Sequence, residues 1–143
     1  MATTDNKAVV RQKWYEELWN RWDVEVADEL FTADYQLHLP GSPTALDRAA
    51  TKEAVAMFGR AFPDLHHTVE EIIAEGDTVA ARWTVHGTHL GTFQGIAPTG
   101  RPVTNTGITV HHTRDGRISE TWLAYDNLSF LGQFGLVHQG AGA

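Results

Sequence analysis

The chain opens with helical periodicity and changes to strand-like alternation near its middle. Apolar residues recur four positions apart at Val10, Trp14 and Leu18, which predicts an amphipathic helix over residues 6–20. Further aromatic residues beside this stripe widen the apolar arc to about half of the helix surface. A helix with so wide an apolar face is expected to lie in a concave surface.

Two more helices and one strand are predicted in the first half of the chain. A short helix is expected over residues 24–31 and a strand over 35–39. Asp47 is placed to cap a third helix that runs to about residue 62. The inner stripe of this third helix is predicted to comprise Ala50, Ala54, Met57, Phe58, Ala61 and Phe62.

The second half reads as an antiparallel meander. The predicted strands cover residues 66–75, 78–86, 103–113 and 117–126, and a short helix over 128–136 precedes a frayed tail at 138–143. Asp115-Gly116 is the strongest hairpin signal, and Gly76-Asp77 is a second one. Helices followed by paired strands predict an α+β fold, in which three N-terminal helices pack on a curved antiparallel sheet around a blind pocket.

Composition narrows the class of protein. A chain of 143 residues fits one domain, and the absence of cysteine excludes disulfides and thiolate metal sites. The net charge of −7, with eleven basic residues scattered among eighteen acidic ones, argues against nucleic-acid binding. No apolar run approaches the roughly 20 residues of a membrane span, and the polar N-terminus lacks a signal peptide's apolar core, so a cytoplasmic location is expected.

Short motifs along nearly the whole chain carry a family resemblance. They include Phe62-Pro63-Asp64-Leu65, Arg82-Trp83-Thr84, Gly87-Thr88-His89, Asp115-Gly116-Arg117-Ile118 and Glu120-x-Trp122. In this order and spacing they resemble the SnoaL-like polyketide cyclases. The resemblance implies one SnoaL-like domain over residues 1–143, with the cone-shaped fold of nuclear transport factor 2 and ketosteroid isomerase. It also implies a homodimer, no cofactor and a hydrophobic small-molecule substrate.

The chain departs from the family at the positions that carry acid–base chemistry. Family members close polyketide rings with a pocket Asp and a His on the neighbouring strand, and these positions fall on Leu123 and Thr109. Both changes remove a titratable group, so the same pair cannot transfer the proton here. The family's pocket aromatic on the first helix falls on Trp19.

Three other residues are candidates for proton transfer. Asp126 ends the last strand, where it can serve as a general acid or base or as the N-cap of the terminal helix. His38 and His111 are the best-placed histidines, although a structural role is the more common one for a histidine. No histidine spacing suits a metal, and none is expected.

Strand parity predicts which side chains face the pocket. If Leu123 marks the pocket side of its strand, Thr121 and Tyr125 face it too, while Glu120 and Trp122 face away into a subunit contact. The full predicted pocket lining is Trp19, Phe58, Phe62, Trp83, Thr109, Thr121, Leu123 and Tyr125.

Three functions remain open at this point. The first is a cyclase or isomerase that folds a polyketide-like or other hydrophobic molecule and transfers a proton. The second is an epoxide hydrolase or dehydratase on the same fold, which would need converging carboxylates, and only Asp126 and Asp64 can be placed. The third is a non-catalytic binding domain, which the missing Asp and His favour.

Overall fold

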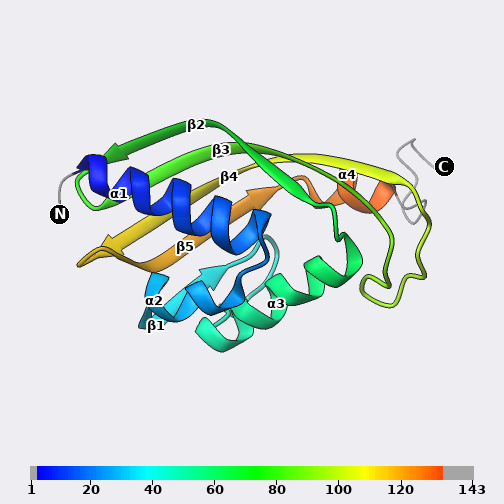
Figure 1. Ribbon diagram of the computed structural model, residues 1–143, viewed down its shortest axis with the longest axis horizontal. Coiled ribbons are helices and arrows are strands. Elements are labelled where there is room, and N and C mark those ends of the chain that lie inside the picture. The colour runs from blue at the N-terminus through cyan, green and yellow to red at the C-terminus, as the bar shows by residue number, and fades with distance from the viewer. Residues whose placement is uncertain (1–2, 134–143) are drawn as a thin grey trace.

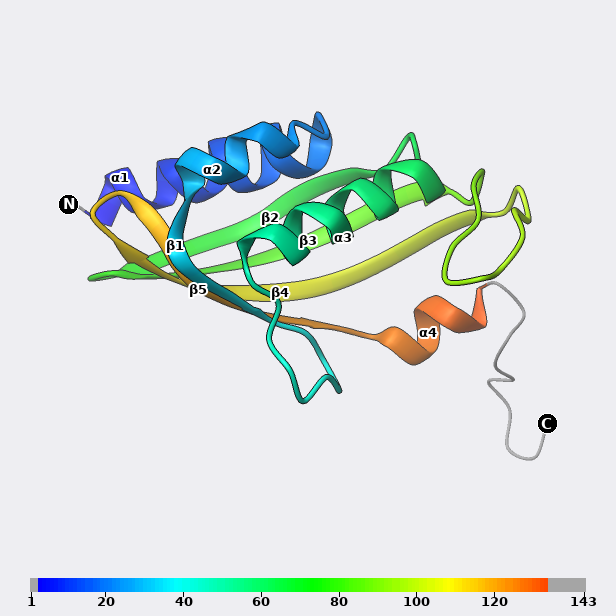
Figure 2. The ribbon, with the colours of Figure 1, turned by 90° about the horizontal axis from the view of Figure 1, so that it is seen from below.

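A curved five-stranded sheet carries helices on one face in the computed structural model, which describes residues 3–133 (Figure 1). The strands are β1 (Phe31–His38), β2 (His66–Glu75), β3 (Thr78–Thr88), β4 (Pro102–Arg114) and β5 (Arg117–Tyr125), in the sheet order β1-β5-β4-β3-β2. The helices are α1 (Thr3–Val9), η1 (Val10–Asn20), η2 (Val24–Val26), α2 (Ala27–Leu30), α3 (Arg48–Ala61) and α4 (Asn127–Gly132). Figure 2 shows α1, α2 and α3 along one face of the sheet, with α4 beyond the end of β5. The predicted α+β architecture is confirmed.

Two tight turns build the meander. Asp115 and Gly116 both have positive φ, 52° and 77°, as a two-residue hairpin turn that matches the strand twist requires. Gly76 (φ 57°) makes the corresponding turn between β2 and β3. Both hairpins therefore form where local turn chemistry predicts them.

The edge strand β1 corrects the expectation of a wholly antiparallel sheet. β2 to β5 pair antiparallel, but β1 pairs with β5 in parallel, with Leu37 opposite Thr121. The strand also begins at Phe31 rather than at residue 35. Phe31 and Tyr35 are both buried and their rings stack at 3.8 Å, so core packing extends the strand at the expense of the predicted helix.

The first helix differs from expectation in its pitch. α1 continues into η1, a π-helical segment with about one more residue per turn than an α-helix. Residues four and five apart then share a face, so the pairs Trp14-Tyr15 and Leu18-Trp19 are all buried against the sheet. This wider turn accounts for the broad apolar arc of the segment.

The third helix begins as predicted. The Asp47 carboxylate accepts a hydrogen bond of 2.8 Å from the Ala50 amide, which satisfies one of the free N–H groups of the first turn. Its most buried positions are Thr51, Val55 and Ala61, and Met57 and Phe58 of the predicted stripe also pack against the core. The terminal helix α4 starts at Asn127, and the predicted helical residues 134–136 and the tail 138–143 lie outside the described residues. Within residues 3–133, none of the helices is both long and apolar enough to span a bilayer.

Candidate functional site

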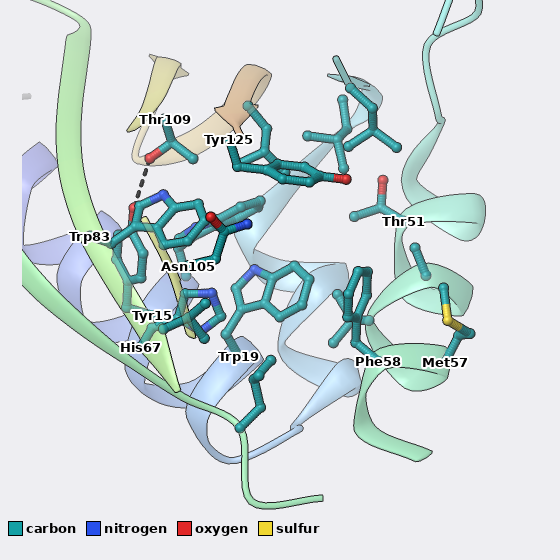
Figure 3. Close-up of a pocket in the computed structure, with 18 of the residues that line it drawn as sticks. Tyr15, Trp19, Thr51, Met57, Phe58, His67, Trp83, Asn105, Thr109 and Tyr125 are labelled. Atoms are coloured by element: carbon teal, nitrogen blue, oxygen red, sulfur yellow. Dashed lines mark hydrogen bonds between the residues drawn. The ribbon is translucent and has the colours of Figure 1, made fainter. Parts of the chain in front are cut away.

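A cavity of about 160 Å³ lies between η1, α3 and the inner face of the sheet (Figure 3). η1 contributes Trp19 and α3 contributes Phe58, whose rings meet edge to face at 5.8 Å. On the opposite wall Trp83 of β3 and Leu123 of β5 complete an apolar surface. A cavity walled by packed aromatic and aliphatic side chains excludes water and suits flat, apolar ligands.

Six residues of the predicted lining lie around this cavity. Trp19, Phe58, Trp83, Thr109, Leu123 and Tyr125 line the cavity. Phe62 lies outside that lining and packs at 5.2 Å against Phe93. Thr121 points to the same side of β5 but is fully buried away from the cavity, where its hydroxyl bonds His111.

A glycine makes room for one wall of the cavity. A Cβ atom added to Gly107 of β4 would lie 2.2 Å from the Trp83 ring and 2.6 Å from the Ala124 carbonyl oxygen. Real Cβ atoms do not approach so closely, so the Trp83 indole can lie flat against β4 only because residue 107 lacks a side chain.

Two hydroxyl groups meet at the buried end of the cavity. The Tyr15 hydroxyl and Thr109 Oγ1 are 2.7 Å apart, as the dashed line in Figure 3 marks. Burial raises the pKa of Tyr15 above its usual range, and the hydrogen bond to Thr109 offsets only part of this effect. Tyr15 therefore stays protonated near neutral pH and acts as a hydrogen-bonding group rather than as a base.

His67 is a polar lining residue that the sequence analysis did not single out. Its ring lies among three aromatic side chains, with centroids 5.3 Å from Trp19, 5.2 Å from Trp83 and 6.0 Å from Tyr15. Asn20, at the end of η1, holds the His67 backbone through bonds of 2.7 and 3.0 Å. Burial, with a smaller contribution from the adjacent His66, lowers the pKa of His67 to about 3, so the ring is neutral near pH 7.

A bulge in β2 explains why parity could not identify His67. The pairing of β2 with β3 shifts register between Val69 and Glu71, which leaves one extra residue in β2. His67 and Val69 face inward before the bulge, whereas Ile72 and Ala74 do so after it. The apolar pattern of the strand therefore changes phase and gives no single inner face.

The three predicted proton-transfer residues all lie outside the cavity lining. The Asp126 carboxylate accepts a hydrogen bond of 2.9 Å from the Ser129 amide, so Asp126 is the N-cap of α4. His111 is fully buried beside Trp14, with ring centroids 4.8 Å apart, and burial lowers its pKa to about 3. His38 lies on the other face of the sheet, where Nε2 is 2.6 Å from Glu120.

The electrostatic character of the cavity follows from these placements. Among residues 3–133, no Asp, Glu, Lys or Arg lines the cavity, and Leu123 and Thr109 are both part of the lining. In the same part of the chain, no three His, Asp or Glu side chains gather as metal ligands would. The site can thus enclose an apolar molecule and hydrogen-bond to it through uncharged groups.

Comparison with known proteins agrees with this architecture. A family model described as SnoaL-like polyketide cyclase matches residues 9–134. IdmH from Streptomyces antibioticus, a candidate polyketide cyclase, shares 35% sequence identity with this chain. Its crystal structure superposes with a TM-score of 0.78, and the match covers 95% of this chain and 100% of the IdmH chain. AclR from Streptomyces galilaeus, a candidate hydroxylase, is 28% identical with a TM-score of 0.85, over 96% of this chain and 89% of its own.

A more distant structure shares the fold. A candidate SnoaL-like polyketide cyclase from Jannaschia sp. CCS1 is 22% identical with a TM-score of 0.86, over 95% of both chains. No curated protein matches the sequence. The family match over most of the chain, together with the curved sheet and its pocket, places this protein in the SnoaL-like polyketide cyclase family.

Proposed function

We propose that this protein is a cofactor-independent cyclase or isomerase that holds a polyketide-like molecule in the pocket and closes a ring by folding it. The observation that carries the proposal is the cavity wall, in which aromatic and aliphatic side chains surround a small group of uncharged polar atoms. IdmH, 35% identical, is described as a candidate polyketide cyclase, which supports the same substrate class.

Enclosure is the main catalytic device in this proposal. Ring closure requires two distant atoms of one flexible chain to approach, and a pocket that holds them together supplies several kcal/mol of the barrier. Trp19, Trp83 and Phe58 have few rotatable bonds and form rigid walls for this purpose. The Tyr15–Thr109 pair would orient an oxygen of the chain at the buried end.

The cavity also bounds the part of the substrate that is enclosed. A cavity of about 150 Å³ is known to hold one benzene ring. The 160 Å³ found here therefore suits one six-membered ring, well below the roughly 300–1,000 Å³ of common ligand pockets. We expect a longer substrate to place its closing ring inside and the remainder toward the pocket mouth, with movement of partly exposed Tyr125.

The alternative of epoxide opening or dehydration has less support. That chemistry needs converging carboxylates, and the two available candidates are both engaged elsewhere. Asp64 binds the amide and hydroxyl of Thr88 at 2.8 Å each, and Asp126 caps α4. A non-catalytic binding domain would use the same pocket without turnover, so product analysis separates it from the cyclase.

The test combines binding with product analysis. Flat aromatic ketones should quench the tryptophan fluorescence of the wild-type protein, and linear unsaturated β-keto thioesters should give cyclic isomers by liquid chromatography and mass spectrometry. Trp19→Phe with Trp83→Phe should lose most of the quenching. Trp122→Phe is the matched control, because Trp122 lies on the other face of the sheet. Quenching without any cyclic product above the buffer rate would favour the binding domain.

We further propose that two copies pair through the outer face of the sheet. Trp122 and Ile108 are 38% and 50% exposed on this face, and large apolar side chains in that position favour a protein contact. The His38–Glu120 pair stands beside Trp122, whose ring stacks on His38 at 5.1 Å.

A further inference from the structure

His67 has an unusual hydrogen-bonding situation for a buried side chain. It is 9% exposed, lines the cavity and has no hydrogen-bond partner at Nδ1, which is shut off from solvent and from the cavity alike. Of its two ring nitrogens, only Nδ1 is closed off in this way. Nε2 therefore keeps accessible surface, on a side chain that lines the cavity.

The position of the ring proton follows from this asymmetry. A neutral imidazole carries one proton, on Nδ1 or on Nε2. A proton on Nδ1 would create a buried donor without an acceptor, and such donors are rare and costly in folded proteins. The Nε2–H form leaves Nδ1 as an unpaired acceptor, which folded proteins tolerate better than an unpaired buried donor, and a ligand in the cavity can accept from Nε2–H. The imidazole is held in place by its aromatic neighbours and by the two Asn20 backbone bonds.

The neutral state of His67 is set by its surroundings. Every ring packed against it, from Tyr15, Trp19 and Trp83, is uncharged, and the adjacent residue His66 disfavours a positive charge on it. No Asp, Glu, Lys or Arg side chain of residues 3–133 lines the cavity. An anionic ligand would thus enter an apolar space without a cation to pair with, which is strongly unfavourable.

We propose that His67 Nε2–H is the donor with which the pocket recognises an uncharged carbonyl oxygen on the enclosed part of the substrate. His67 is then a specificity-determining residue for neutral ketones over hydrocarbons of the same shape and over carboxylates. The inference deepens the proposed function, since it specifies the substrate as an uncharged carbonyl compound. It concerns binding, however, and is measured independently of turnover.

Three single-ring probes of similar size separate the contributions, and each suits the cavity volume. Acetophenone offers a carbonyl oxygen, ethylbenzene has nearly the same shape without it, and benzoate carries a negative charge. Binding is measured by calorimetry or tryptophan quenching at pH 7.5. One net hydrogen bond contributes about 0.5–1.5 kcal/mol, so acetophenone should bind about 2- to 13-fold more tightly than ethylbenzene. Benzoate should bind more weakly than either.

Variants assign the preference to His67. His67→Phe should bind acetophenone and ethylbenzene equally, because the ring shape remains while the donor is lost. His67→Gln keeps an N–H donor and should retain part of the preference. His66→Phe is the matched control, because it makes the same change at an exposed neighbour that does not line the cavity and leaves the His67 imidazole in place.

A measurement on the wild-type protein covers the case in which a variant does not fold. With ¹⁵N-labelled histidine, nitrogen NMR should show His67 as the Nε2–H form, and acetophenone should shift that signal while ethylbenzene leaves it nearly unchanged. An Nδ1–H form, equal affinities for the two probes, or benzoate binding as tight as acetophenone would overturn the inference. Equal affinities would leave the proposed enclosure intact, whereas failure of all three probes to bind would overturn both.

Discussion

Acidification should destabilise this protein through two buried histidines, well before its carboxylates are protonated. Burial holds the pKa of His67 and of His111 at about 3, whereas an unfolded chain titrates histidine near 6.5. Between these values the unfolded state binds more protons, so stability is complete above about pH 6.5 and falls as pH decreases toward 3. From pH 7 to pH 5 the loss is about 2 kcal/mol for each histidine and about 4 kcal/mol for both. Such a loss is a large part of the roughly 5–15 kcal/mol that stabilises a typical domain.

Urea unfolding at pH 7 and pH 5, at one protein concentration and one ionic strength, measures this difference. His67→Gln and His111→Gln should each remove about half of the pH dependence, because an amide does not titrate in this range. His66→Gln is the matched control, since His66 is exposed and adjacent to His67. The reasoning is refuted if wild-type stability changes by less than about 1 kcal/mol between the two pH values, or if the double variant keeps the full dependence.

Three further predictions concern packing, capping and assembly. Gly107→Ala should lower the free energy of unfolding by about 1–3 kcal/mol and shift the tryptophan emission, because the added Cβ collides with Trp83. Unchanged stability in thermal unfolding would contradict this close approach. Asp126→Asn should keep both stability and turnover, because Asn caps a helix about as well as Asp, whereas a turnover loss of about 10²-fold would restore Asp126 as the acid–base residue. Light scattering at micromolar concentration should give the mass of a dimer for the wild-type protein and the mass of a monomer for Trp122→Glu. A monomeric wild-type protein would exclude the proposed interface.

Local chemistry in the sequence determined the framework of the fold. The hairpin at Asp115-Gly116 requires positive φ at two successive residues, and the sequence pair favours that conformation before any tertiary contact forms. The Asp47 cap likewise depends on a residue only three positions away. Alternation along β3 placed Trp83 toward the pocket, and that strand pairs with β4 without a register shift. The place of Leu123 came from the family resemblance rather than from alternation.

Tertiary structure decided the chemistry of the pocket. The Tyr15–Thr109 pair joins residues 94 positions apart, and no local pattern links them. His67 faces the cavity beside its pairing partner Val85, while the bulge after Val69 puts the rest of β2 in the opposite phase and hides this from the strand pattern. Its low pKa comes from burial among rings supplied by η1 and β3. Propensity and periodicity act over a few residues, whereas burial and the resulting charge state depend on which distant elements meet. The sequence alone therefore indicated the strands that line the site and some of its polar residues, such as Thr109, but not that Tyr15 and His67 join them there.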